Sequence, residues 1–384
     1  MIQQKFVSSR NNNQDDKIYQ DKPELRFEGF KECWNDYYLE DCVYFLDKER
    51  KPLKESDRKN KKGEYPYYGA SGIIDYIDEY IFDDELILMG EDGANIISRN
   101  SKLVFLAKGK FWVNNHAHVL KAKENFDSYF LTETLERINY EKYNTGTAQP
   151  KLNQEVCAKI KLKMPSFDEQ KKIADFLSTI DNKIELLEKK HKNYINFKKY
   201  LMELIFTDKY LFNNDYEITT LGKITDISTG NKDVKDKKDD GKYPFFVRSE
   251  KIERIDSYSF DGEAILIPGD GKIGEIYHYI NGKFDYHQRV YKISDFNQNV
   301  NGKYIFYYLQ KNFLKQALRN TAKATVDSLR LNTLTDMKIE LLSLEQQNKI
   351  ADILSTTEEK INLTEKNLYN MKIFKKGLLQ KMFV

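Results

Sequence analysis

The segment SFDEQKKIADFLSTIDNKIELLEKKHKNYINFKKYLMELIF at 166–206 occurs a second time, as SLEQQNKIADILSTTEEKINLTEKNLYNMKIFKKGLLQKMF at 343–383. The two segments align without a gap at an offset of 177 residues (343 minus 166), and about half of the aligned positions are identical. Self-similarity at a fixed offset indicates an internal duplication. The chain is therefore expected to consist of two similar halves.

Both segments have the heptad pattern of a coiled-coil helix, with apolar residues every seven positions in two rows. Thr357 and Thr364 interrupt the rows in the second segment, where Ile180 and Leu187 fill them in the first. The two helices are therefore expected to pair antiparallel, with apolar stretches against interrupted ones. The residues expected to pair the helices are Ile173, Leu177, Ile180, Ile184, Leu187, Ile350, Leu354, Ile361 and Leu368.

Each helix also has a predicted start. Ser166 with Glu169, and Ser343 with Gln346, have the spacing of a capping box. About forty residues at 1.5 Å each give a helix of about 60 Å. An ordinary helical bundle core is the alternative interpretation, but nothing else in the sequence supplies further helices for a bundle.

The segments before the two helices repeat more weakly and have β character. YPYYGASGIIDYIDEYIFDDELILMGEDG (65–93) matches YPFFVRSEKIERIDSYSFDGEAILIPGDG (243–271), and short apolar and aromatic runs cut by Gly and Asp are typical of strands and turns. Downstream, GKFWVNNHAHVL (109–120) resembles GKFDYHQRVY (282–291), and we align His116 with His287.

We therefore predict an α+β fold with a pseudo-two-fold internal repeat, in which two β-rich domains alternate with two long helices that form an antiparallel coiled coil. The junction between the halves is expected at TDKYLFNNDYE (207–217), and residues 1–20 are expected to be flexible. The predicted domains are 1–165 and 209–342 for the β-rich modules, and 166–208 and 343–384 for the helices.

Composition narrows the class of protein. The chain has 384 residues, 32% of them charged, with a net charge of +2, so any nucleic-acid contact must depend on local clusters of charge. Its three cysteines have no metal-ligand spacing, and reduced thiols in a cytoplasmic protein are expected. We expect no signal peptide and no membrane span, because no apolar run approaches the length that either requires.

Catalytic motifs are missing from the sequence. GDGKIGE (269–275) lacks the spacing of a phosphate-binding loop, and there is no Asn-Pro-Pro-aromatic, G-x-S-x-G or His-Glu-x-x-His motif. His116 and His118 are expected on one side of a strand as a satisfied or substrate-facing pair, because the further ligands of a metal site are not apparent. We therefore expect no catalytic residues and no metal, although the scattered acidic residues leave a nuclease site open.

Local charge and polar side chains indicate where a nucleic acid would bind. The segment 48–62 holds eight basic and three acidic residues, while the equivalent 231–242 is Lys-rich but nearly balanced. Basic loops suit phosphate contact, and Asn, Gln, Arg, His and Ser suit base edges, although a solvated loop or a turn is the simpler role for each residue alone. The DNA-binding candidates are Lys48, Arg50, Lys51, Arg58, Lys59, Ser71, Asn95, Arg99, Asn114, His116, Thr147, Gln149 and Lys151 in the first module, and Lys232, Lys235, Arg248, Ser249, Lys272, His287, Arg289, Lys323, Thr325 and Arg330 in the second.

These features together resemble the specificity subunit of type I restriction-modification systems. PELRFEGF (23–30) followed by Trp34 resembles the opening of that family, LGKITDISTGN (221–231) the entry to its second recognition domain, and GTAQPKLN (146–153) a closing loop. EQKKIADFLSTID (169–181) and its twin QQNKIADILSTTE (346–358) resemble its central and distal spacers. The loop that closes the second module departs from the pattern, since it lacks Gly-Thr-Ala-Gln-Pro.

The resemblance implies two target recognition domains that each read one half of a bipartite double-stranded DNA site. It also implies two modification subunits that carry S-adenosylmethionine and methylate adenine, a restriction subunit that uses ATP and Mg, and no cofactor on this chain. Three alternatives remain: a coiled-coil scaffold whose β modules bind proteins, a single-chain restriction-methylation enzyme, which the missing methyltransferase motifs disfavour, and an orphan or phase-variable chain.

Overall fold

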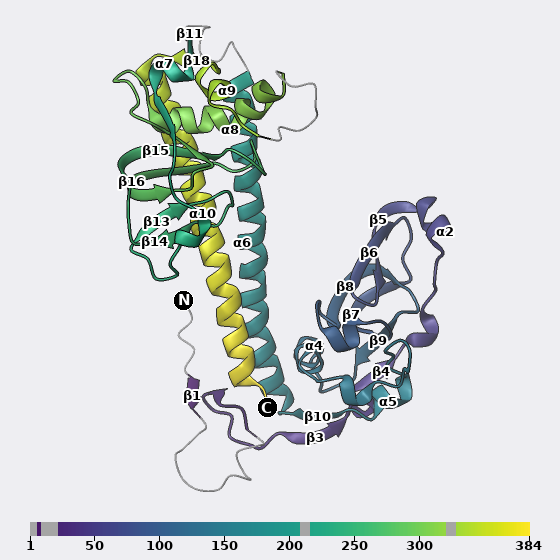
Figure 1. Cartoon of the computed structure of the whole chain (residues 1–384). Helices are drawn as coiled ribbons and strands as arrows, with labels where there is room; N and C mark the ends of the chain where they lie inside the picture. Colours follow the sequence, from purple (N-terminus) through teal and green to yellow (C-terminus); the bar gives the residue numbers. More distant parts are fainter. Residues whose placement is uncertain (1–5, 9–21, 208–215, 320–327) are drawn as a thin grey trace. The chain divides into compact units, whose positions relative to one another are not determined.

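The computed structural model describes residues 6–8, 22–207, 216–319 and 328–384 (Figure 1). The chain divides into two compact units. Unit 1 consists of Met1–Leu186 and Leu368–Val384, and unit 2 of Leu187–Asn367. Each unit therefore contains one β-rich module and a part of each long helix.

The module of unit 1 is built on a six-stranded sheet with the strand order β4-β9-β7-β8-β5-β6, in which only the β5–β8 pair is parallel. Its strands are β4 (Val43–Phe45), β5 (Lys62–Gly69), β6 (Gly72–Ile77), β7 (Phe82–Gly90), β8 (Val104–Val113) and β9 (Ala117–Ala122). Two small antiparallel sheets pair β1 (Phe6–Ser8) with β2 (Leu25–Phe27), and β3 (Asn35–Tyr38) with β10 (Lys161–Met164). The helices are α1 (Leu39–Cys42), η2 (Asp47–Glu49), α2 (Glu55–Lys59), α3 (Asn95–Ser98), α4 (Ser128–Glu136), η3 (Glu141–Tyr143) and α5 (Gln154–Ala158).

The module of unit 2 repeats this arrangement, because its sheet has the order β12-β17-β15-β16-β13-β14 and only the β13–β16 pair is parallel. Its strands are β12 (Asp226–Thr229), β13 (Tyr243–Phe246), β14 (Glu253–Ile255), β15 (Phe260–Pro268), β16 (His278–Tyr286) and β17 (Val290–Ser294), with β11 (Tyr216–Thr220) and β18 (Lys338–Leu342) as a separate antiparallel pair. The helices are α7 (Leu221–Ile224), η4 (Val234–Asp236), α8 (Gly302–Arg319) and α9 (Leu331–Thr335). The predicted α+β class and internal repeat are confirmed.

The central strand of each sheet is buried on both faces because successive side chains point to opposite sides. In β7, Ile87 and Met89 join the core that contains α4, whereas Leu86 and Leu88 join a second cluster with Phe111. The same alternation divides the side chains of β15 between the core that contains α8 and a second cluster. This explains why these strands are continuous apolar runs in the sequence.

The two repeated segments form the long helices α6 (Phe167–Thr207) and α10 (Leu344–Met382). In unit 1, the first half of α6 shares a core with the last turns of α10, including Leu378 and Met382. In unit 2, the last turns of α6 pack on the core that includes Ile350 and Leu354 of α10 (Figure 1). The predicted antiparallel pairing is therefore confirmed within each unit.

Of the predicted seam residues, Ile173, Leu177, Ile180 and Ile184 belong to the core of unit 1, and Ile350 and Leu354 to the core of unit 2. Ile173, Leu177, Ile180, Ile350 and Leu354 are buried, while Ile184, Leu187, Ile361 and Leu368 are half-buried. The buried hydroxyls of Thr357 and Thr364 donate to the carbonyl oxygens of Ile353 and Lys360, 2.8 and 2.6 Å away, so both polar interruptions have a partner within the helix.

A buried glutamine joins the start of each long helix to the start of a module helix. Gln170 Oε1 accepts from the backbone N–H of Asp127, which caps α4, at 3.0 Å, and Gln347 Oε1 accepts from that of Asn301 before α8 at 2.8 Å. Their amide nitrogens donate to Pro165 and Leu342. The duplication thus includes the way each module is attached to a helix.

One local expectation, the capping box of Ser166 and Glu169, was wrong. The capping box of Ser343 and Gln346 is present, but Glu169 at the start of α6 forms a buried ion pair with Arg26 instead. Residues 6–8 of the N-terminal segment form β1, and Tyr216 and Glu217 of the expected junction begin β11; the remainder of 1–20 and residues 208–215 lie outside the described residues.

Cys33 is exposed and Cys42 and Cys157 are buried, all three as free thiols. Burial raises the pKa of the Cys42 thiol to about 12, so this group stays protonated. Within the described residues, none of the helices is both long and apolar enough to cross a bilayer.

Candidate nucleic-acid interface

In the first module, polar groups gather where β7 ends. Asp92 follows the strand, and its carboxylate lies 2.8 Å from Nδ1 of His116, which is 51% exposed in the turn between β8 and β9. Asp92 also forms an isolated bridge with Lys151, whose ammonium lies 3.3 Å from Glu91. The end of β7 thereby brings His116 next to the closing loop 144–151.

The loop 144–151 is held in one shape by its own residues. The side-chain oxygen of Asn144 accepts from the backbone N–H groups of Gly146 and Lys151, at 3.0 and 2.9 Å. A Cβ at Gly146 would lie 1.8 Å from the carbonyl oxygen of Gln149, so only glycine fits this turn. The exposed side chains of Thr147 and Gln149 are consequently presented on a fixed backbone.

A network of charged side chains, in which His118 is buried and the others are half-buried, lies next to these polar groups. Asp47 lies 2.6 Å from Nδ1 of His118, whose other ring nitrogen lies 2.8 Å from the carbonyl oxygen of Leu152. Arg50 contacts Glu91 at 2.6 Å and donates to the carbonyl oxygen of Ala117 at 2.8 Å. Burial alone would lower the pKa of His118, but the hydrogen bond to Asp47 and the charge of that carboxylate outweigh it and raise the pKa to about 10.

Asp47, Glu91 and His118 could in principle hold a metal ion, since each has a ligand atom within 4.8 Å of the others. Both ring nitrogens of His118 already face an oxygen acceptor, and Arg50 supplies the positive charge beside the two carboxylates. These contacts describe a charge-balanced support for the loop, and we assign no metal to it.

The second module has an equivalent corner with different side chains. Asp270 follows β15 and forms an isolated bridge with Ser328, as Asp92 does with Lys151. Its carboxylate binds Nη1 of Arg248 at 3.0 and 3.1 Å and Nη1 of Arg289 at 2.9 Å. Both arginines are well exposed. Their hydrogen bonds and their charge outweigh partial burial and lower the pKa of Asp270.

The two corners correct the predicted alignment of His116 with His287. Asn114 Oδ1 accepts from the backbone N–H of His116, just as His287 Nδ1 accepts from that of Arg289. The carbonyl oxygens of His116 and Arg289 in turn accept from Glu91 and Gly269. His116 therefore corresponds to Arg289, and the buried His287 corresponds to the buried Asn114.

Several predicted DNA-binding residues have structural partners in the fold. Arg58 lies over the ring of Tyr67 and near Asp75, Arg99 binds Glu136 at 2.8 Å, and the side chain of Asn95 bonds the backbone of Ser101. Arg50, Asn114 and His287 likewise form turns or ion pairs within the fold. These contacts favour a structural role for all six residues over contact with DNA.

Other candidates lie on the surface. Lys59 pairs with Glu55 on its own helix, Ser249 bonds the backbone of Lys251, and Lys232 forms a backbone bridge with His287. Lys48, Lys51, Ser71, Lys235, Lys272 and Arg330 are exposed. Lys323 and Thr325 lie outside the described residues.

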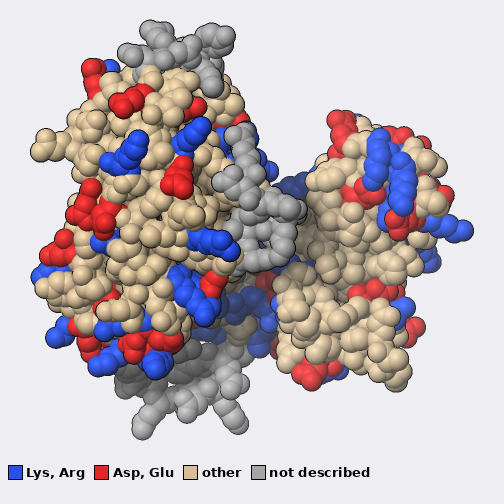
Figure 2. Space-filling view, turned by 45° about the horizontal axis from the view of Figure 1, so that its top comes forward, with Lys and Arg blue, Asp and Glu red and all other residues tan. Residues whose placement is uncertain are grey.

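The positive charge of the segment 48–62 is partly neutralised by its neighbours. Lys61 and Lys62 form ion pairs with Glu79 and Asp75, each at 2.6 Å. On the face drawn in Figure 2, Lys and Arg lie among Asp and Glu and large uncharged areas, and one small group of Lys and Arg is flanked by acidic side chains. Phosphate contact on this face would therefore depend on individual side chains and not on a broad basic patch.

Sequence reasoning missed the carboxylates that organise both corners, because a single aspartate carries no pattern of its own. A signal was present, since Asp92-Gly93 and Asp270-Gly271 occupy matching positions in the repeat. Among the predicted residues, the structure gathers His116, Thr147, Gln149 and Lys151 at one corner, and Arg248 and Arg289 at the other.

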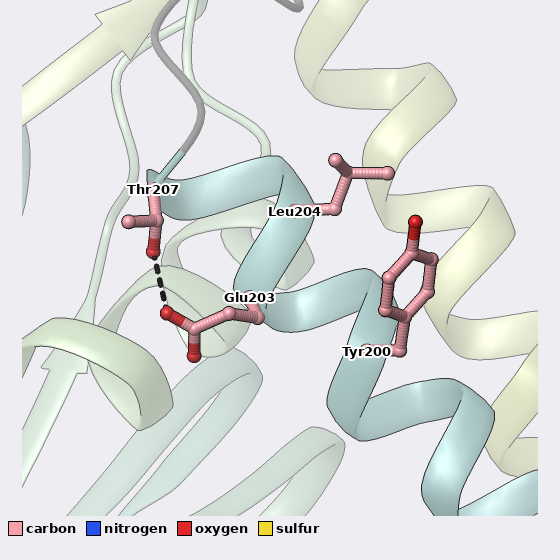
Figure 3. A pocket seen from close by; sticks show the side chains of 4 residues that line it. All are labelled: Tyr200, Glu203, Leu204 and Thr207. Atoms are coloured by element: carbon pink, nitrogen blue, oxygen red, sulfur yellow. Dashed lines mark hydrogen bonds between the residues drawn. The ribbon is translucent and has the colours of Figure 1, made fainter.

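A hollow of about 270 Å³ lies apart from these corners, on the last turns of α6 (Figure 3). It is lined by Tyr200, Glu203, Leu204 and Thr207. Glu203 accepts from the Thr207 hydroxyl at 3.1 Å and pairs with Lys311 of α8. Because its carboxylate already has these partners, we assign no ligand to this hollow.

Comparison with known proteins gives a consistent result. A family model described as type I restriction modification DNA specificity domain matches residues 31–196 and 213–371. A Haemophilus influenzae protein provisionally named a type I restriction enzyme specificity subunit is 27% identical over 377 residues, covering 88% of this chain and 91% of its own. The MjaVIII specificity subunit of Methanocaldococcus jannaschii is 24% identical over 405 residues and 91% of each chain.

A solved structure has the same fold over nearly the whole chain. The crystal structure of the S subunit of a type I restriction-modification system from M. genitalium superposes with a TM-score of 0.74. The match covers 94% of this chain and 99% of the other, at 17% sequence identity.

Proposed function

The chain belongs to the type I restriction-modification DNA specificity family as a non-catalytic specificity subunit, and from this we propose that its two modules each read one half of a bipartite site in double-stranded DNA. Contact with base edges in each half-site would come from the corner at the end of the central strand. The helices α6 and α10 would hold the two modules at a fixed separation along the duplex.

The observation that carries this proposal is that equivalent corners display different side chains. Asp92 and Asp270 occupy the same place in the two sheets. One is accompanied by His116 and by the exposed Gln149, and the other by Arg248 and Arg289. Arg pairs with guanine, whereas Gln pairs with adenine, so such corners would read different sequences.

We further propose that the helices bind two modification subunits, which would carry S-adenosylmethionine and methylate adenine, and that a restriction subunit using ATP and Mg joins them. The repeat leaves identical apolar residues exposed in both copies, namely Leu186 with Leu363, and Phe197 with Phe374. Two equal apolar positions suit two identical partners.

Replacing both arginines, with Arg248→Ala and Arg289→Ala, is expected to relax the half-site read by unit 2 and leave the other half-site unchanged. Each lost bidentate contact would reduce discrimination by about 1–3 kcal/mol. The measurement is sequencing of methylated adenines in a host that expresses the chain with type I modification subunits.

The matched control is Lys238→Ala, an exposed lysine of the same module that pairs with Asp256. It removes a positive charge and is expected to leave both half-sites intact. If the unaltered chain directs no new methylated motif, or if the two arginine replacements degrade both half-sites equally, the proposed reading is wrong; the first result would favour a protein-binding scaffold.

A further inference from the structure

In unit 1, a lysine on α10 is buried against two carboxylates. Nζ of Lys375 lies 2.8 Å from Glu133 of α4 and 2.8 Å from Asp181 of α6, and its side chain is 11% exposed. The hydroxyl of Tyr129, also on α4, donates to Asp181 at 2.5 Å, and Lys375 lies over the Tyr129 ring, 5.8 Å from its centre. These residues, which we name cluster 1, join three helices.

Unit 2 contains the same arrangement with the two long helices exchanged. Nζ of Lys198 on α6 lies 3.0 Å from Glu358 on α10, and the hydroxyl of Tyr307 on α8 donates to Glu358 at 2.8 Å. Lys198 also lies over the Tyr307 ring, 5.3 Å from its centre. We name these three residues cluster 2.

The ion pairs of the two clusters are equivalent in the repeat, because Lys198 and Lys375 are 177 residues apart (375 minus 198), as are Asp181 and Glu358 (358 minus 181). The tyrosines are not equivalent. Asp127 and Asn301 cap α4 and α8 in the same way, so Tyr307 takes the place of Glu133, one helical turn beyond the place of Tyr129. Each copy nevertheless contains a lysine, a tyrosine and a carboxylate. In each, the lysine comes from one long helix, the carboxylate from the other and the tyrosine from the module.

Such clusters distinguish one register of the helix pair from the others, which the apolar seam alone does not. A heptad seam packs equally well after a shift of seven residues, but a shift would leave the buried Lys375 and the half-buried Lys198 without their carboxylates, which is most costly for Lys375. The tyrosine also constrains the helix of the module. Its hydroxyl reaches the carboxylate only when that helix lies at one angle to α6 and α10.

The two clusters also differ in a way that distinguishes the modules. Glu133 of cluster 1 corresponds to Tyr307 of cluster 2, so α4 supplies a carboxylate to Lys375 where α8 supplies a tyrosine hydroxyl to Glu358. If α8 took the place of α4, Lys375 would lose one of its two carboxylates. The difference therefore favours the attachment of each module to its own end of the helices.

We propose that clusters 1 and 2 are positioning groups that set the register of the helix pair and the angle of each module on it. Building on the proposed function, they would fix the spacing between the two half-sites without touching DNA.

Charge reversal within cluster 2 tests this role. Lys198→Glu places two carboxylates together and is expected to raise amide hydrogen exchange of α8 on the order of ten-fold. It should also spread methylation over sites whose half-sites differ in spacing. The double variant Lys198→Glu with Glu358→Lys restores the opposite charges and should recover both properties, while Lys349→Glu, at an exposed lysine of α10, should change neither.

The milder Tyr307→Phe removes only the hydroxyl and is expected to loosen α8 while the helix pair stays intact, which covers the case in which the charge reversal prevents folding. Exchange in α8 that is unchanged by both single variants, or not recovered by the double variant, overturns the proposal. Hydrogen exchange requires no DNA, so it tests the positioning role independently of the proposed function. If the single variants speed exchange in α8 and the double variant restores it, the positioning role is retained. If the unaltered chain then directs no methylation, only the proposed function is rejected.

Discussion

Replacing Arg26 with methionine is expected to lower the free energy of unfolding of unit 1 by about 3–5 kcal/mol. Nε and Nη2 of Arg26 donate to the two oxygens of Glu169, both at 2.7 Å, and the side chains are only 4% and 1% exposed. The replacement would leave the Glu169 carboxylate buried without its counter-charge at the point where α6 begins. Urea unfolding followed by tryptophan fluorescence measures the change, because Trp34 and Trp112 both lie in unit 1.

The double variant Arg26→Met with Glu169→Leu is expected to recover most of this loss, since two apolar side chains can replace a buried ion pair. The matched control is Gln346→Ala, at the equivalent position of α10 in unit 2, where the side chain forms only an exposed cap. This replacement should leave the fluorescence-detected unfolding of unit 1 unchanged. A loss below about 1 kcal/mol for Arg26→Met would show that the pair does not secure the start of α6.

The stability of unit 1 is also expected to fall as the pH rises from about 6.5 to 10. The folded pKa of His118, about 10, lies above its ordinary value of 6.5, so its contribution is complete below pH 6.5 and is lost as the pH rises through the folded pKa. A shift of this size corresponds to about 3–5 kcal/mol. Asp47 has a lowered pKa, so its own contribution is lost only under acid, below its ordinary value of 3.8.

Comparison with His118→Gln isolates this effect, since glutamine can donate one hydrogen bond but does not titrate. The gap in stability between the unaltered chain and the variant should narrow from pH 6.5 to 10, measured again by tryptophan fluorescence in urea. Unit 2 has Tyr291 at the equivalent position, where its hydroxyl donates to Leu329, and the pKa of Tyr291 is raised by burial. A gap that stays constant across this range would contradict a charged His118.

Much of the architecture was predictable because it depends on repetition and periodicity. The offset between the two helical segments predicted the two halves, and the heptad rows predicted the faces that Leu177 and Leu354 bury. Both signals come from many residues at once, so single exceptions such as Thr357 do not remove them.

The contacts that depend on a single partner far along the chain could not be predicted. The spacing of Ser166 and Glu169 predicts a local cap, but the partner of Glu169 is Arg26, 143 residues away, and a sequence pattern contains no information about that pairing. In the same way, the sequence shows Lys61 and Lys62 only as part of a basic segment, whereas the fold places Glu79 and Asp75 beside them. His116 was aligned with the wrong residue because the turn, and not the residue type, is what the two modules share.

The central claim is that the paired helices set the distance between the two half-sites. Its most direct test is the insertion of one heptad into both helices, after Leu187 in α6 and after Asn367 in α10. Seven residues at 1.5 Å lengthen each helix by about 10.5 Å while the seam keeps its phase. Insertion into α6 alone is the control, because it breaks the match between the helices and should abolish recognition.

Mapping of methylated adenines with and without the paired insertion gives the answer. At 3.4 Å per base pair, the account predicts that both half-sites keep their sequence and that the gap between them grows by about three base pairs. A paired insertion that leaves the gap unchanged would contradict it.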